Sequence, residues 1–190
     1  MKIILASASP RRRELLEMLR VGNLEIVPAK GGEKPHPELT PEELVKELSR
    51  AKASEIAASA GPEDVVIGAD TVVALDGAVL GKPKDSADAK RMLTALSGRE
   101  HSVFTGVTVI RGGTVLQRAE HSLVRFRALQ EGEIDRYIAS GEPLDKAGAY
   151  GAQGLASLFV ERIDGDFFNV MGLPLCLLGT MLKEFDIHLI

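Results

Sequence analysis

The sequence predicts an α/β fold built on a mixed, twisted β-sheet with flanking helices. In the first half of the chain, short apolar runs rich in β-branched residues alternate with segments of helical periodicity. Two long strand candidates then follow each other at residues 100–111 and 114–127, joined at Gly112-Gly113. Alternating strands and helices favour parallel pairing, whereas consecutive long strands favour antiparallel pairing. Both patterns in one chain indicate a mixed sheet.

The composition limits how the chain can be organised. A chain of 190 residues, 45% of them hydrophobic, is long enough to bury one sizeable core. We find no internal repeat, no low-complexity tract and no clear linker in it. We therefore expect one domain over residues 1–190, built either as a single body or as two lobes that share one sheet.

Charge and residue usage argue against several partners and locations. A net charge of -4 argues against non-specific nucleic-acid binding, and no tryptophan is present for base stacking. Cys176 lies in an apolar run, so we expect it in the core, and a single cysteine fits a reducing compartment. The N-terminal apolar run is too short for a signal peptide or a membrane span. We expect a soluble cytoplasmic protein.

A basic helix start follows the first predicted strand. Ser9 and Pro10 suit the N-cap and the first position of a helix over about residues 10–20. Arg11, Arg12 and Arg13 fill the first turn, where the helix dipole is already positive and cations are unfavourable. Bound phosphate would offset that cost, since free backbone N–H groups and guanidinium groups both bind anions. A solvated basic turn is the alternative.

The next helix has a clear beginning. Thr40, Pro41 and Glu43 form a capping-box pattern, and the helix should run to about Ala60, before Gly61-Pro62. Lys52 falls on its apolar stripe. A lysine there usually extends to water, although it can also point into a site lined by anions.

An acidic residue interrupts a buried strand at residues 65–75. Asp70 stands in the middle of this β-branched run, and a carboxylate there is costly to desolvate unless a cation or donors meet it. Asp76-Gly77 predicts a hairpin turn, which brings Lys82 within reach of Asp70 across two strands. Costly buried acids gather at functional sites, and the alternative is an acid that caps a strand end.

The second half of the chain supplies the remaining elements. A helix capped by Asp85 or Ser86 should end near Leu96, and another should span residues 130–140. Residues 143–154 hold three glycines, so their backbone can approach a ligand closely. The last elements are a predicted strand at residues 155–163 and a predicted apolar helix from Pro174 to near Phe185.

Five motifs, in order from end to end, resemble the Maf (septum formation) family. They are Leu-Ala-Ser-Ala-Ser-Pro-Arg-Arg at 5–12, Gly-Ala-Asp-Thr-Val-Val at 68–73, Gly-Lys-Pro at 81–83, Asp-Lys-Ala-Gly-Ala-Tyr-Gly-Ala-Gln-Gly at 145–154 and Asn-Val-Met-Gly-Leu-Pro-Leu at 169–175. The resemblance implies a nucleoside triphosphate pyrophosphatase that cuts between the α and β phosphates. It also implies a homodimer and a two-lobed architecture with a central cleft, like that of inosine triphosphate pyrophosphatases.

The resemblance assigns the chemistry to four residues. Asp70 matches the base for the attacking water, and Lys52 and Lys82 match lysines that face the phosphates. Glu33 matches a loop carboxylate that holds a divalent metal together with Asp70. Mg²⁺ or Mn²⁺ fits two carboxylates plus phosphate oxygens, and no His or Cys cluster in the sequence suggests zinc.

The resemblance also assigns substrate binding. Ser7, Arg11 and Arg12 match the phosphate-binding turn, and Arg11, Thr71 and Gln153 match positions linked to base selection. The late loop resembles the dTTP/UTP branch of the family, and we hypothesise that the Gln153 amide pairs with thymine or uracil. Arg13 is a third consecutive arginine that departs from the pattern, so the sequence leaves open which two arginines bind phosphate.

Two classes of function remain. The first is a metal-dependent, housecleaning pyrophosphatase acting on dTTP, UTP and modified pyrimidine triphosphates. The second is a nucleotide- or nucleic-acid-binding regulator of cell division without turnover. The combination of Asp70, Glu33, Lys52 and Lys82 favours the enzyme, because a sensor needs no acid that activates water.

Overall fold

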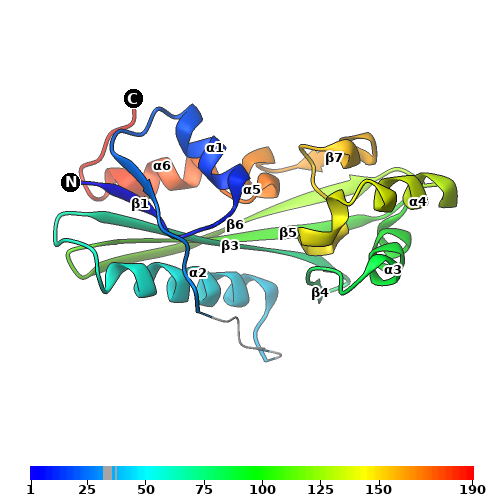
Figure 1. Cartoon of the computed structure of the whole chain (residues 1–190), viewed down its shortest axis with the longest axis horizontal. Helices are drawn as coiled ribbons and strands as arrows, with labels where there is room; N and C mark the ends of the chain where they lie inside the picture. The colour runs from blue at the N-terminus through cyan, green and yellow to red at the C-terminus, as the bar shows by residue number, and fades with distance from the viewer. Residues whose placement is uncertain (32–35, 37) are drawn as a thin grey trace.

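The computed structural model describes residues 1–31, 36 and 38–190. Across these residues the chain forms a seven-stranded mixed sheet with helices on both faces (Figure 1). The strands are β1 (Ile3–Leu5), β2 (Leu24–Ile26), β3 (Val65–Leu75), β4 (Ala78–Leu80), β5 (Glu100–Arg111), β6 (Thr114–Phe126) and β7 (Val160–Asp164). The α-helices are α1 (Pro10–Met18), α2 (Pro41–Ala57), α3 (Ser86–Leu96), α4 (Glu131–Ala139), α5 (Phe167–Met171) and α6 (Leu175–Lys183). Short 3₁₀ helices are η1 (Glu142–Asp145), η2 (Ala147–Ala149) and η3 (Leu155–Leu158).

Local sequence signals set several of these boundaries. The Thr40 hydroxyl accepts from the Glu43 backbone N–H, and the Glu43 carboxylate accepts from the Thr40 N–H, so the predicted capping box starts α2. Asp85 caps α3 through the Asp88 N–H at 2.8 Å. The β-branched run that predicted a buried strand forms β3, the strand at the centre of the sheet.

The mixed sheet is confirmed, and its pairing leaves a gap beside β3. The sheet order is β2-β1-β3-β5-β6-β7, with β1 parallel to both β2 and β3 and the later pairs antiparallel. β5 pairs with β3 from Val66 to Ala74. On the opposite edge, β1 pairs with β3 as far as Ile67, and β4 pairs from Val73 onward. The intervening part of β3 is thus open on that edge, between the ends of two short strands.

The helices build hydrophobic cores on both faces of the sheet. α1, α5 and α6 pack on one face, and α2 lies along the other beneath β3 and β5 (Figure 1). α3 and α4 form a separate core with the far ends of β3, β5 and β6, around the fully buried Phe126. β3 and β5 contribute side chains to all three cores.

Two glycines let α2 lie directly on the sheet. A Cβ on Gly106 of β5 would stand 2.1 Å from the Val45 carbonyl oxygen of α2. A Cβ on Gly68 of β3 would stand 2.3 Å from the Ser49 carbonyl oxygen. Only residues without a side chain permit this approach, so the pair fixes α2, and with it Lys52, close to β3.

Two sequence expectations are corrected. Cys176 is exposed on α6 and not in the core, because its apolar neighbour Leu178 occupies the buried face of the helix. Residues 155–163 are not one strand, since η3 precedes β7. Two glycines of residues 143–154 also make room for neighbouring side chains: a Cβ on Gly151 would meet Lys146, and one on Gly154 would meet Glu142.

No helix in the described part of the chain is long and apolar enough to span a bilayer.

Candidate functional site

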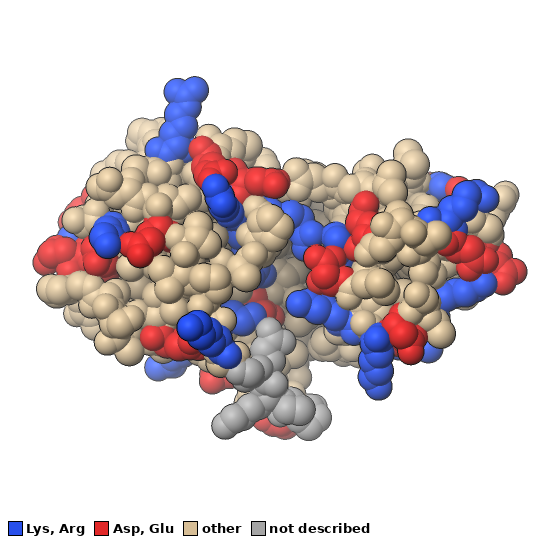
Figure 2. All heavy atoms as spheres, viewed as in Figure 1, with Lys and Arg blue, Asp and Glu red and all other residues tan. Residues whose placement is uncertain are grey.

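A cavity of about 830 Å³ lies where the edge of β3 is open. Its wall combines the β1–α1 turn, α2, the middle of β3, the residues after β4 and the loop before η2. Figure 2 shows Lys and Arg side chains gathered around a hollow near the middle of the molecule, with a few acidic side chains among them. The cavity therefore has the charge that a polyanion requires.

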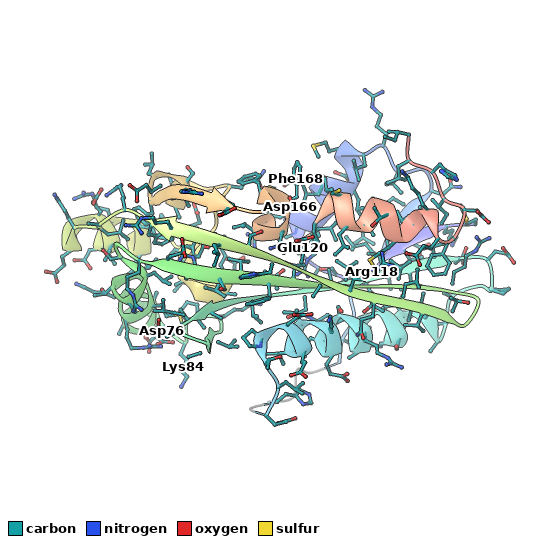
Figure 3. All side chains as sticks on the ribbon, turned by 180° about the vertical axis from the view of Figure 1, so that it is seen from behind. Asp76, Lys84, Arg118, Glu120, Asp166 and Phe168 are labelled. Carbon is teal, nitrogen blue, oxygen red and sulfur yellow. The ribbon has the colours of Figure 1, made fainter. Side chains whose placement is uncertain are left out.

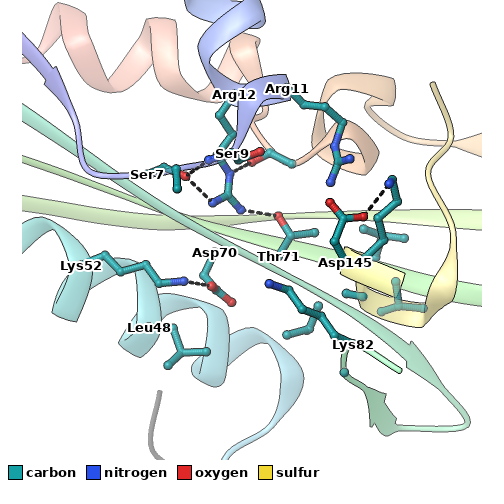
Figure 4. A pocket seen from close by; sticks show the side chains of 18 of the residues that line it. Ser7, Ser9, Arg11, Arg12, Leu48, Lys52, Asp70, Thr71, Lys82 and Asp145 are labelled. Atoms are coloured by element: carbon teal, nitrogen blue, oxygen red, sulfur yellow. Dashed lines mark hydrogen bonds and ion pairs between the residues drawn. The ribbon is translucent and has the colours of Figure 1, made fainter. Parts of the chain in front are cut away.

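Asp70 and Lys52 form an ion pair inside the cavity (Figure 4). Asp70 is only 7% exposed and points from β3 toward α2, from which Lys52 Nζ donates to its carboxylate. Successive residues of a strand face opposite sides of the sheet, so Thr71 points to the other face, toward α1. The ion pair offsets the desolvation free energy that the sequence predicted for a buried carboxylate. It also directs the Lys52 side chain into the cavity.

Among the described residues, Gly172, Ser7 and Thr71 accept hydrogen bonds that orient Arg12. Its Nε donates to the Gly172 carbonyl at 2.7 Å, one terminal nitrogen donates to the Ser7 hydroxyl at 3.1 Å, and the other donates to the Thr71 hydroxyl at 3.1 Å. Ser7 is itself buried and also accepts from the Ser9 N–H at 3.2 Å. These contacts fix the plane of the guanidinium group against the cavity wall.

Arg11 extends into the cavity opposite Asp145 (Figure 4). Burial alone would raise the pKa of Asp145, but the hydrogen bond from Lys146 and the charges of Lys146 and Arg11 outweigh it and lower that pKa. Lys146 donates to Asp145 at 2.6 Å and to the Glu142 carbonyl at 2.6 Å. Lys82 follows β4, and its ammonium group points toward Asp70 from the opposite side to Lys52 (Figure 4).

Seven of the predicted site residues lie together in this cavity: Ser7, Arg11, Arg12, Lys52, Asp70, Thr71 and Lys82. Arg13 is exposed and pairs with Glu17 at 2.7 Å on the outer face of α1, so Arg11 and Arg12 are the two arginines that face the cavity. Gln153 is exposed, and it does not line the cavity as described. Glu33 lies outside the described residues.

Sequence reasoning missed other members of the cavity wall. Asp145 and Lys146 line the cavity and lie within the glycine-rich segment 143–154, where two adjacent residues of opposite charge were the signal that could have identified them. Tyr150 lines the cavity and forms a 2.8 Å hydrogen bond with His101 Nε2. Burial lowers the pKa of His101 to about 4, and burial also raises the pKa of Tyr150. No sequence pattern linked these two residues, because β5 and the loop meet only in the folded chain.

The carboxylates of the cavity are hard oxygen donors. Asp70 and Asp145 are the acidic residues among the described lining residues. In the described part of the chain, no group of three or more His, Cys, Asp or Glu side chains is arranged to hold a metal. One or two carboxylates suit Mg²⁺ or Mn²⁺ that share their coordination sphere with phosphate oxygens and water, and the donor set does not suit zinc.

The fold and the site together define a class: an α/β protein with a cationic cavity around a buried carboxylate, which suits a phosphorylated ligand. The chain belongs to the Maf family, because the family model for Maf-like proteins matches residues 2–185. A dTTP/UTP pyrophosphatase of Bacillus mycoides is 48% identical over 97% of this chain and 96% of its own length. A dTTP/UTP pyrophosphatase of Bacillus cytotoxicus is 47% identical over the same shares.

A solved structure supports the architecture. The Ham1 protein of Staphylococcus aureus superposes on 97% of this chain and 99% of its own, with a TM-score of 0.52 and 13% sequence identity. Similarity at that identity concerns the fold. It supports the mixed α/β architecture with a sheet flanked by helices.

Proposed function

We propose that this protein hydrolyses dTTP and UTP to the nucleoside monophosphate and pyrophosphate. The observation that carries the proposal is the convergence of the Asp70–Lys52 pair with Arg11, Arg12 and Lys82 in one cavity. A triphosphate carries about four negative charges at neutral pH, and this set of cations matches them. The names of the Bacillus relatives, which align over nearly the whole chain, support the same substrates.

We propose Asp70 as the general base. It belongs to the stretch of β3 that neither β1 nor β4 pairs, and its carboxylate lines the cavity in which the phosphates would bind. In this role it accepts the proton of the water that attacks the α-phosphorus, while pyrophosphate leaves. Lys52 and Lys82 flank it and stabilise the negative charge that grows on the phosphate oxygens in the transition state.

A divalent cation completes the proposal. Asp70 would hold Mg²⁺ or Mn²⁺ together with Glu33, and the metal would supply positive charge next to the scissile anhydride. Glu33→Gln should therefore raise the metal concentration needed for half-maximal activity. This is measured by titrating the metal into enzyme from which a chelator has removed divalent cations. The exposed Glu38→Gln on the same segment is the control, and equal behaviour of the two variants would contradict the assignment.

Base selection is proposed for Arg11, Thr71 and Gln153. Gln153→Ala should reduce the ratio of kcat/KM for dTTP to that for dCTP by more than it reduces dTTP turnover, since an amide can pair with the thymine edge. Gln153→Glu is the matched variant. Equal losses for all bases would exclude a selectivity role, which matters here because Gln153 lies outside the described cavity wall.

A substrate panel tests the proposal directly. Pyrophosphate release should be fastest with dTTP and UTP among all common nucleoside triphosphates, with Mg²⁺ or Mn²⁺ present. Absence of turnover with every triphosphate would leave the regulator of cell division as the better description. The resemblance also implies a homodimer, and the sequence composition predicts a cytoplasmic protein. Sedimentation velocity at micromolar concentration tests the first, and fractionation of cells tests the second.

A further inference from the structure

We infer that Thr105, a fully buried threonine of β5, is a positioning residue that fixes Arg12 through Thr71. The inference rests on the proposed function only in naming the ligand of Arg12 as a polyphosphate. Thr105 lies directly opposite Thr71 in the β3–β5 register, and the two hydroxyl groups are 2.9 Å apart. Thr105 does not line the cavity as described, so it acts through its neighbour.

The direction of each hydrogen bond follows from the chemistry of its two ends. The Arg12 guanidinium can only donate, so Thr71 accepts from it at 3.1 Å. The Asn169 carbonyl can only accept, so Thr105 donates to it at 3.0 Å. Each hydroxyl has one proton, and therefore Thr71 must donate to Thr105. The hydrogen-bond network runs from Arg12 through Thr71 and Thr105 to the Asn169 carbonyl. The direction of each of its hydrogen bonds is therefore determined.

Asn169, the last residue of this hydrogen-bond network, is anchored to the sheet. The buried Asn169 side chain donates to the Val103 carbonyl at 3.1 Å and to the Ser122 hydroxyl at 2.9 Å. Ser122 donates to the Asp166 carbonyl at 3.0 Å, and the Asp166 side chain caps α5 at Phe168. Figure 3 shows Asp166 and Phe168 at α5, next to the long strands. The Asn169 carbonyl is thus a fixed acceptor.

The same short helix holds Arg12 a second time. Gly172, at the C-terminal end of α5 with φ of 106°, presents the carbonyl that accepts from Arg12 Nε. α5 therefore sets the guanidinium directly through Gly172 and indirectly through Asn169 and the two threonines. This explains why the Asn-Val-Met-Gly motif at 169–172 belongs to the site although Asn169 is buried. It also means that Thr71 meets a ligand only as an acceptor, because its proton is committed to Thr105.

Hydroxyl replacement tests the inference. Thr105→Val keeps the shape of the side chain but removes the donor, and we expect kcat/KM for dTTP to fall about 10- to 100-fold, as a misplaced binding group would cause. Thr105→Ser restores the hydroxyl and should bring kcat/KM back to within about threefold. Thr108→Val is the control: Thr108 is equally buried on β5 and bonds the Ser49 hydroxyl at 2.9 Å, away from Arg12. It should lose stability but keep kcat/KM.

A double-mutant cycle shows whether Thr105 acts through Arg12. In an Arg12→Lys background, Thr105→Val should change kcat/KM by less than about twofold, because the group that it positions is gone. An undiminished loss in that background, or equal kcat/KM for Thr105→Val and Thr108→Val, would overturn the inference.

Anion binding separates this inference from the proposed reaction. Calorimetry with inorganic tripolyphosphate needs no turnover, and Thr105→Val should bind it about tenfold or more weakly than either the wild type or Thr108→Val. Equal binding by all three proteins, or no binding by the wild type, would overturn the role of Thr105. Tripolyphosphate binding that depends on Thr105, without hydrolysis of any nucleotide, would retain this inference and reject the proposed function.

Discussion

At the scale of single residues, burial explains the chemistry of Asp70. A carboxylate inside a strand loses its hydration, and the adjacent Lys52 replaces part of what water provided. Removing either charge alone would take away the ion pair that offsets part of the desolvation of the other. Burying this ion pair costs desolvation free energy. Such pairs are found mainly at functional sites, where both charges have a role.

Asp70→Asn should remove catalysis but keep the substrate. The amide has nearly the same shape and cannot accept the water proton, so we expect kcat for dTTP to fall about 10²–10⁴-fold. Binding of a non-hydrolysable dTTP analogue, measured by calorimetry, should weaken by less than about tenfold, since the cations of the cavity remain. Near-normal kcat in this variant would show that another group accepts the proton.

His101 gives the stability of the protein a measurable pH dependence. Burial lowers its pKa to about 4 in the folded state, whereas an unfolded chain has the ordinary value of about 6.5. The unfolded state therefore binds the extra proton first, and stability falls as the pH drops through this window. The contribution is present above about pH 6.5 and decreases toward pH 4.

His101→Phe should flatten that dependence. Phe keeps the aromatic contacts with Phe126 and Tyr150 but cannot be protonated. Between pH 7 and pH 5, the wild type should lose about 2 kcal/mol more unfolding free energy than the variant does, measured by urea titration at each pH. The exposed His188→Phe is the control and should leave the dependence unchanged. Parallel curves for wild type and His101→Phe would contradict the assignment.

The sequence alone could identify some of these residues and not others. Asp70 could be found because its neighbours are apolar and β-branched, which marks a buried position. The side to which Arg13 points could not be found, since it depends on how α1 lies against the sheet. Cys176 was misplaced for a similar reason: a helix with apolar residues on several faces does not reveal which face is covered.

At the scale of elements, the position of α2 determines whether Lys52 reaches Asp70. Gly68 and Gly106 allow backbone of the helix to contact backbone of the sheet. The capping box predicted where α2 begins, but the role of the two glycines needed the partner strand and the helix together. A lone glycine in a strand signals only that something approaches closely.

Gly106→Ala should push α2 away from the sheet. The added methyl group would overlap the Val45 carbonyl, so we expect a loss of about 1–3 kcal/mol in unfolding free energy, together with lower kcat. Gly179→Ala in α6 is the matched control, because nothing lies within 4 Å of its Cβ, and it should gain about 0.5–1 kcal/mol from helix propensity. Urea titrations of both variants check this, and a neutral Gly106→Ala would contradict the tight contact.

At the scale of the whole molecule, two hydrophobic cores share continuous strands. The core around α1 and α6 and the core around α3 and α4 both take side chains from β3 and β5. If β3 or β5 lost its pairing in one core, the packing of the other core would also be disturbed. The expectation of a single domain with two lobes leads to one cooperative unfolding transition.

Two spectroscopic probes test that cooperativity. Tyr137 and Tyr150 both lie in the core around α3 and α4, and the chain has no tryptophan, so tyrosine fluorescence reports on that lobe. Far-UV circular dichroism reports on all elements. The two urea transitions should coincide in midpoint and in slope. A fluorescence transition at lower urea than the dichroism transition would show that the lobe unfolds separately.

The incomplete edge of β3 has a mechanical consequence. The cavity arises where β1 and β4 end, while β5 continues unbroken along the other edge of β3. The two walls are therefore joined by a stiff hydrogen-bonded ladder and not by a flexible joint. A ligand cannot draw the lobes together as in a clamshell without bending that ladder. The side chains that extend into the cavity must therefore provide ligand recognition. Substitutions of these side chains for other nucleotides can leave the β3–β5 pairing unchanged.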